Sequence, residues 1–98
     1  MQKVGTISAL LQQSPLKAKV GDTRILVFLV DNAPIATQAR CPHAQGPLHE
    51  AEICKSMLTC VWHGWQFDLL TGKCEEDPGL LLERYEVKVD GDDIYVTV

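Results

Sequence analysis

The 98-residue chain contains no long hydrophobic run, no internal repeat and no low-complexity segment. Its longest apolar run, residues 25–30, has six residues, whereas a membrane-spanning helix needs about 20. The N-terminal stretch MQKVGTISALLQQ has neither the basic region nor the apolar stretch of a secretory signal. We therefore expect a cytoplasmic protein with no membrane partner.

The chain also lacks a run of basic residues. Residues 1–74 contain seven Lys or Arg and five Asp or Glu, whereas residues 75–98 contain two and eight, for a net charge of −4. Because proteins that bind nucleic acids usually carry clustered positive charge, we expect no nucleic-acid partner. The acidic last quarter indicates a solvated surface that helps solubility.

Long helical patterns are absent as well, and short apolar runs alternate with turn signals. This pattern is typical of an all-β protein with small antiparallel sheets, and the length indicates a single domain, residues 1–98. The expected strands are Leu16–Val20, Thr23–Val30, residues 35–40 after a turn at 31–34, and a C-terminal hairpin of residues 85–89 and 94–98. We expect Thr23–Val30 to be buried on both faces. The one expected helical turn is residues 8–12, with Ser8 as its N-cap.

The chemistry-bearing residues concentrate in the middle segment, residues 41–79, which holds all four cysteines, all three histidines and both tryptophans. Cys41 and His43 form a C-x-H pair, and Cys60 and His63 form a C-x-x-H pair sixteen residues later. An extended C-x-H sends both side chains to one side, and Gly64 lets the backbone of C-x-x-H bend.

A hairpin between the two pairs would bring them together. Residues 51–54 and 57–60 can form its strands, with residues 55–56 at its tip. Two thiols and two imidazoles would then face a common point. This donor set suits zinc or an iron–sulfur cluster.

Over nearly its whole length, the sequence resembles the family of Rieske-type [2Fe–2S] ferredoxins. The residues that carry the resemblance are Cys41-Pro42-His43, Gly46-Pro47-Leu48, Cys60, His63-Gly64-Trp65, Phe67-Asp68, Thr71-Gly72, Tyr85-Glu86-Val87 and Ile94-Tyr95-Val96. The resemblance implies a Rieske fold in which the middle segment is a cluster-binding insert on a β base. It also implies one [2Fe–2S] cluster, with Cys41 and Cys60 on one iron and His43 and His63 on the other.

The resemblance further indicates the low-potential, oxygenase-associated branch of the family. Rieske subunits of respiratory and photosynthetic complexes carry an additional disulfide between the two loops and a serine just after the second His-Gly. This chain has Trp65 in place of that serine and no further cysteine in either loop. Hydrogen bonds to the cluster sulfurs favour the reduced state, so the loss of one lowers the potential. Gln45, where many ferredoxins of this branch have glycine, is the one departure in the first loop.

By the same resemblance, the protein is a one-electron carrier without a substrate site of its own, and therefore not an enzyme. Its partners would be a flavin- or ferredoxin-dependent reductase and a terminal oxygenase, and it would act as a monomer. Two alternatives remain open: a small electron-feeding subunit of a nitrite reductase-like complex, and a zinc-stabilised binding module.

Several residues near the motif are expected to have other roles. Cys54 and Cys74 fall outside the ligand pattern, and the sequence does not decide whether they pair. We expect His49 to be an exposed loop residue and Trp65 to pack over the inner side of the cluster. Residues 77–80 form either a proline-bearing loop that shields the cluster or a plain surface turn.

Overall fold

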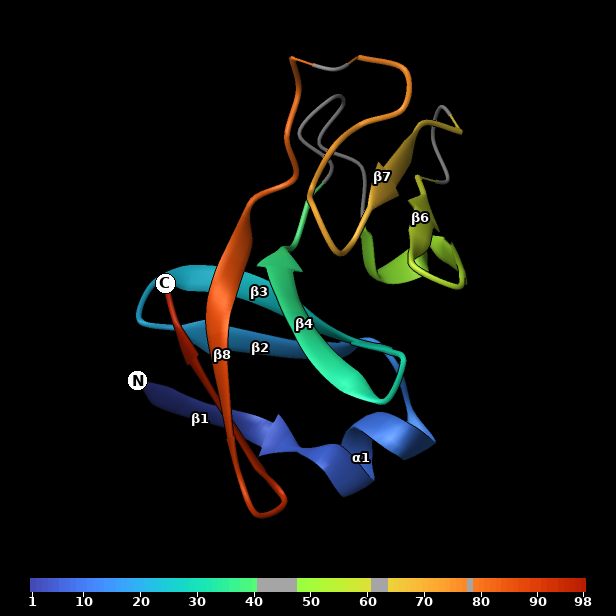
Figure 1. Ribbon diagram of the computed structural model, residues 1–98. Coiled ribbons are helices and arrows are strands. Elements are labelled where there is room, and N and C mark those ends of the chain that lie inside the picture. Colours follow the sequence, from blue (N-terminus) through green and yellow to red (C-terminus); the bar gives the residue numbers. More distant parts are fainter. Residues whose placement is uncertain (41–47, 61–63, 78) are drawn as a thin grey trace.

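The computed structural model describes residues 1–40, 48–60, 64–77 and 79–98. These residues form a larger antiparallel sheet and a smaller one stacked at one end of it (Figure 1). The larger sheet has the strand order β1-β9-β8-β4-β3-β2, from β1 (Gln2–Thr6), β2 (Leu16–Val20), β3 (Thr23–Val30), β4 (Ala33–Gln38), β8 (Arg84–Asp90) and β9 (Asp93–Thr97). The smaller sheet has the order β5-β6-β7, from β5 (Glu52–Cys54), β6 (Met57–Thr59) and β7 (Gln66–Asp68). The all-β prediction is confirmed.

Strands β2, β3 and β4 form a meander whose turns set its register. Strands β2 and β3 have the predicted bounds, and Gly21 with φ 61° lies in the turn that joins them. Asp31 and Asn32 both have positive φ, 50° and 64°, which is the requirement of a two-residue type I′ hairpin turn. The predicted turn through residue 34 was therefore too long. Strand β4 begins at Ala33, opposite Val30, and ends at Gln38 rather than at residue 40.

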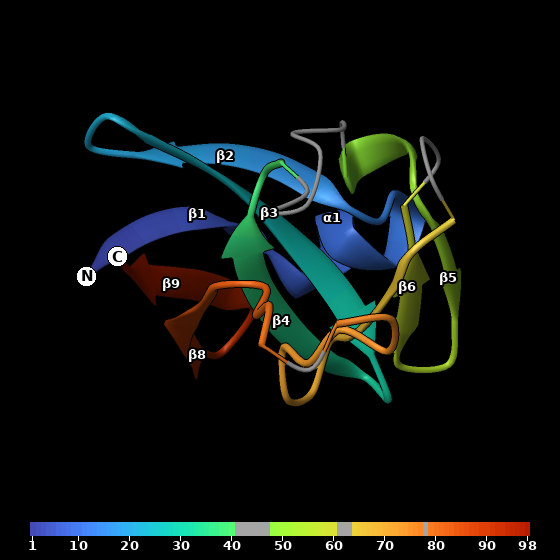
Figure 2. The same cartoon turned by 90° about the horizontal axis from the view of Figure 1, so that it is seen from above.

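The larger sheet curls so that its two edge strands meet. Figures 1 and 2 show β1 and β2 side by side. Gln2 joins them, because its Nε2 donates to the Lys19 carbonyl oxygen at 2.9 Å and its Oε1 accepts from the Gly21 amide at 3.4 Å. Strand β1, which the sequence did not predict, also pairs with β9 of the predicted C-terminal hairpin. The curled sheet encloses one hydrophobic core, formed by Leu10, Val20, Ile25, Val27, Ala36, Ile94 and Val96.

The short helix α1 (Ile7–Gln12) begins one residue earlier than expected, and its N-cap lies two residues earlier. Its N-cap is Thr6, which leaves β1 with extended backbone and accepts a hydrogen bond from the Ala9 amide through Oγ1 at 3.1 Å. The prediction of Ser8 as N-cap was wrong. The Ser8 hydroxyl instead donates to Asp92 Oδ2 at 2.9 Å, in the turn between β8 and β9. In the described part of the chain, no helix is long and apolar enough to span a membrane.

Strand β3 separates two cores and is buried on both faces, as predicted. Ile25 and Val27 face the inside of the curled sheet, whereas Leu26, Phe28 and Val30 belong to a second core beneath the smaller sheet. Successive side chains of a strand point to opposite faces, so one strand of alternating core residues can join both layers. The smaller sheet is therefore fixed to the larger one by hydrophobic packing.

Candidate metal centre

The smaller sheet is built around the hairpin that the sequence predicted. Strands β5 and β6 pair from Glu52–Thr59 to Cys54–Met57, and Lys55 at the tip has φ 56°. Each strand is one residue shorter than expected at the end away from the tip. Strand β7, which was not predicted, adds to β6 and places Leu58 opposite Phe67, both fully buried.

The chain on both sides of the C-x-H segment is held together by one backbone bond. The Leu48 amide donates to the Ala39 carbonyl oxygen at 3.2 Å, across residues 40–47. Leu48 begins the short 3₁₀ helix η1 (Leu48–Glu50) and is fully buried. This bond and the buried leucine fix the base from which the first loop starts and to which it returns.

The C-x-x-H segment is closed in a similar way. The Cys60 amide donates to the Trp65 carbonyl oxygen at 2.9 Å, and the Gly64 amide donates to the Cys60 carbonyl oxygen at 2.9 Å. Gly64 has φ 71°, in the left-handed region that glycine adopts without strain. The bend predicted at Gly64 is confirmed.

Both segments start from the same hydrophobic core. Cys60, which is 1% exposed, lies in the second core together with Leu48, Leu58 and Phe67. Trp65 is half-buried and packs against this core. The chain segments that follow the C-x-H pair and begin the C-x-x-H pair, at Leu48 and Cys60, thus lie in one core.

A carboxylate that belongs to no sequence motif supports the second segment. Glu76 Oε1 accepts from the Gln66 amide at 2.7 Å, immediately after Trp65, and it also accepts from the Cys74 thiol at 3.8 Å. The Glu75 amide adds a bond to the Gln66 carbonyl oxygen at 2.9 Å. Glu76 is exposed, as expected for the acidic last quarter, and it also anchors the strand after Trp65 through this bond.

The connection between β7 and β8 covers this core from the other side. The Leu82 amide donates to the Gly72 carbonyl oxygen at 2.7 Å, and Leu82 is buried in the same core as Cys60. Gly72 has φ 82°, and a Cβ added to it would lie 2.6 Å from the Leu82 carbonyl oxygen. The Thr71-Gly72 pair of the sequence motif thus marks a close approach of two backbone segments.

The shifted pKa values in the described part of the chain belong to the larger sheet. Burial raises the pKa of the Tyr85 phenol, and the charge of Glu83 raises it further. A hydrogen bond to Asp93, at 3.0 Å from Nζ to Oδ1, raises the pKa of Lys3. The ionisation of Tyr85 and of Lys3 therefore reports on the larger sheet and not on the predicted cluster site.

The family model of the Rieske [2Fe–2S] domain matches residues 1–96. The chain belongs to this family. The ferredoxin component of biphenyl 2,3-dioxygenase from Rhodococcus jostii is 34% identical over 82 residues, which cover 83% of this chain and 77% of that protein. A chain in the solved complex of reduced oxygenase and oxidised ferredoxin of carbazole 1,9a-dioxygenase is 27% identical, with a TM-score of 0.85 over 97% of this chain and 99% of that one.

Other relatives of this Rieske domain are much longer proteins. Human apoptosis-inducing factor 3 is 36% identical over 58 residues, which are 58% of this chain and 10% of that protein. The chain spans only 10–16% of the length of the first curated relatives that it matches. The Rieske fold expected from the sequence is confirmed, and the family's cofactor is a [2Fe–2S] cluster.

The structure describes one of the four predicted ligands of the cluster, Cys60. Cys41, His43 and His63 lie outside the described residues. In the ranges that the structure describes, no group of three or more His, Cys, Asp or Glu side chains is arranged to hold a metal ion.

The donor set nevertheless fits a Rieske cluster, which takes two thiolates and two imidazoles. Cys60 is a buried thiol outside any disulfide, and both of its backbone groups are used in the turn bonds. Its Sγ is therefore the polar atom of Cys60 that remains to bind a metal.

The other cysteines, His49 and the turn at residues 77–80 lie near the predicted cluster ligands in the sequence. Cys54 is exposed at the hairpin tip, Cys74 is 4% exposed in the core, and neither is in a disulfide. His49 is exposed in η1, as expected. Asp77 forms a turn in which its Oδ1 accepts from the Gly79 amide at 3.0 Å. Trp62 and Pro78 lie outside the described residues.

Proposed function

We propose that this Rieske domain is a ferredoxin, a one-electron carrier between a flavin- or ferredoxin-dependent reductase and a terminal oxygenase. The observation that carries the proposal is the match with the biphenyl dioxygenase ferredoxin component, which extends over most of both chains. The carbazole dioxygenase complex supports it, because there a ferredoxin is combined with its oxygenase. We propose that residues 1–98 act as one domain, in which the insert at about 41–79 holds the cluster.

Cys41, His43, Cys60 and His63 would hold the cluster. When bound, the cluster supplies reversible one-electron chemistry, in which one of two ferric irons becomes ferrous. The described residues anchor the two loops at their bases: Leu48 and Cys60 lie in the core, and the Glu76–Gln66 bond holds the strand after Trp65. Anchored loop bases suit electron transfer, because a preorganised site needs little reorganisation when its charge changes.

The proposal assigns the chain to the low-potential branch, and Trp65 at the expected serine position supports this assignment. It describes an electron-transfer component rather than an enzyme, so the substrate would be bound and oxidised by the partner oxygenase. The cytoplasmic location and the monomeric state remain predictions from the sequence. The nitrite reductase subunit is not favoured, because ferredoxin components of oxygenase systems are among the curated relatives that match over most of both chains. The family assignment likewise favours an iron–sulfur cluster over a zinc-stabilised module.

Protein-film voltammetry on anaerobically purified protein tests this function. We expect one reversible one-electron wave, together with two irons and two acid-labile sulfides per chain. Cys60→Ser should abolish the wave, whereas Cys54→Ser, at the exposed hairpin tip, should keep it. The absence of a wave from the unaltered protein, or one zinc per chain in place of iron, would contradict the proposal.

A further inference from the structure

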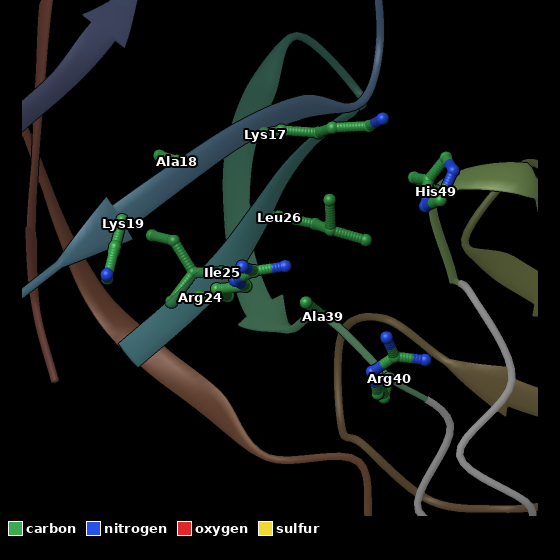
Figure 3. Close-up of a pocket in the computed structure, with 9 residues that line it drawn as sticks. All are labelled: Lys17, Ala18, Lys19, Arg24, Ile25, Leu26, Ala39, Arg40 and His49. Atoms are coloured by element: carbon green, nitrogen blue, oxygen red, sulfur yellow. The ribbon is translucent and has the colours of Figure 1, made fainter. Parts of the chain in front are cut away.

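A groove of about 470 Å³ lies between the outer face of the larger sheet and the insert (Figure 3). Its floor is apolar and its rim is basic. The lining residues are Lys17, Ala18 and Lys19 of β2, Arg24, Ile25 and Leu26 of β3, and Ala39, Arg40 and His49 at the base of the first loop. We call this site the basic groove.

The charge of the basic groove is opposite to the charge of the protein. Four of the nine Lys and Arg residues of a chain with net charge −4 line it. None of the described residues that line it is acidic. Within the described part of the chain, Lys17, Lys19 and Arg24 make no ion pair with a carboxylate. The groove is therefore a positively charged region on the surface of a protein whose net charge is negative.

This arrangement costs stability. Lys19 and Arg24 are directly opposite each other in the β2–β3 register, and like charges in that position are destabilising. Lysines on edge strands commonly prevent aggregation, and β2 is at one end of the strand order. That role does not account for Arg24, because β3 is paired on both sides.

The groove adjoins the segment that carries the first pair of predicted ligands. Arg40, which lines the groove, directly precedes Cys41 in the sequence. Figure 3 shows Arg40 and His49 across the groove from Lys17 and Leu26. A molecule bound in the groove therefore lies within a Debye length, about 10 Å at 0.1 M salt, of the start of the loop.

We propose that the basic groove is a docking surface for an acidic patch on the protein that accepts electrons from this chain. The inference rests on the proposed function and goes further in one respect: it predicts that the partner's contact surface is negatively charged. Three basic side chains come from two neighbouring strands and are spread along an open rim, which suits a partner surface better than a single small anion. Complementary charge accelerates the encounter of two proteins by about 10- to 1,000-fold at low salt.

The test uses two haem proteins of opposite surface charge as electron acceptors, acidic cytochrome b5 and basic cytochrome c. Reduced holoprotein is mixed with each acceptor in a stopped-flow instrument over a range of salt concentrations. The groove variant carries Lys17→Gln, Lys19→Gln and Arg24→Gln, and Arg40 is left unchanged because it adjoins Cys41. The control variant has the same net charge and carries Lys55→Gln, Lys73→Gln and Lys88→Gln, all outside the groove. A third variant, with Lys17→Arg, Lys19→Arg and Arg24→Lys, keeps the charge of the groove.

At low salt, we expect the groove variant to reduce cytochrome b5 about 10-fold more slowly than the unaltered protein, and with a weaker salt dependence. The control variant should change this rate less than about 2-fold, and the charge-conserving variant should keep it. The visible spectrum and the midpoint potential should be the same in all four proteins. Oxidation by cytochrome c should not slow in the groove variant.

Equal slowing by the groove and control variants would show that only net charge matters and would overturn the inference. A second pair of results would also overturn the inference: NMR shows that inorganic pyrophosphate binds saturably in the groove, and the groove variant reduces cytochrome b5 at the unaltered rate. The site would then bind a small anion. A cluster-bearing protein that reduced neither acceptor would contradict the proposed function itself and the inference with it.

Discussion

A substitution at Gly72 tests the close backbone contact by which the connection between β7 and β8 packs against the hydrophobic core that contains Cys60. Gly72 has φ 82°, its amide donates to the Asp68 carbonyl oxygen at 2.6 Å, and its carbonyl oxygen accepts from the Leu82 amide at 2.7 Å. A Cβ at this position would lie 2.6 Å from the Leu82 carbonyl oxygen. Gly72→Ala therefore forces two backbone segments apart.

The expected loss of stability has two parts. The left-handed conformation costs a residue with a side chain about 1–2 kcal/mol. The forced backbone shift costs a further amount, about 1–3 kcal/mol by analogy with overpacked cores. Gly21→Ala is the matched control, because Gly21 has φ 61° and nothing within 4 Å of its added Cβ. The difference between the two variants isolates the collision with Leu82, which we estimate at about 2 kcal/mol.

Thermal unfolding of the two holoprotein variants, followed by circular dichroism at one scan rate, measures this difference. For a domain of this size, about 2 kcal/mol corresponds to a Tm about 8–16 °C lower for Gly72→Ala than for Gly21→Ala. Because both variants contain the cluster, its contribution to stability cancels in the difference between their Tm values. Equal Tm values would refute the argument, because they would mean that the added Cβ of Gly72→Ala does not collide with the Leu82 carbonyl oxygen.

Three further predictions follow from other contacts. The double variant Cys54→Ser, Cys74→Ser should keep the visible absorption of the cluster, and its loss would mean that one of these thiols is a ligand. Glu76→Ala should lower the free energy of unfolding in urea by about 0.5–1.5 kcal/mol, because the Gln66 amide loses its acceptor. Glu76→Gln keeps an acceptor oxygen and should lose less, and equal losses would contradict this. Stability should fall as the pH rises above about 10, because the raised pKa of Tyr85 means that the folded state keeps a proton which the unfolded state releases. Tyr85→Phe should make that fall shallower in urea titrations between pH 8 and 11, and an unchanged slope would count against the assignment.

The sequence predicted the elements that local signals determine. The bounds of β2 and β3 are predictable because the turn signal Gly21-Asp22 separates the alternating pattern of β2 from the apolar run of β3. The hairpin tip at Lys55 is predictable because it likewise separates two short strand patterns. Strand β1 was missed because it depends on long-range pairing with β9. The N-cap was misplaced because Thr6 and Ser8 are both good capping residues, and only the exit from β1 selects Thr6.

The candidate site was predicted through its spacing, and the features around it were not. Two cysteine–histidine pairs at a fixed separation are visible in a sequence, as is the glycine that bends the second segment. The basic groove is invisible there, because Lys17, Arg24 and His49 come together only when β2, β3 and η1 are assembled. Glu76 was equally hidden, since its bond to Gln66 depends on how the connection after β7 folds back.

The measurement that tests the central claim most directly is pulsed electron paramagnetic resonance on the dithionite-reduced protein. The account predicts a reduced [2Fe–2S] signal that is coupled to two directly bound imidazole nitrogens, those of His43 and His63. A reduced-cluster signal without bound nitrogen would mean an all-cysteine cluster, which would need all four cysteines of the chain, Cys54 and Cys74 included. A protein that gives no signal and contains zinc would contradict the iron–sulfur centre altogether.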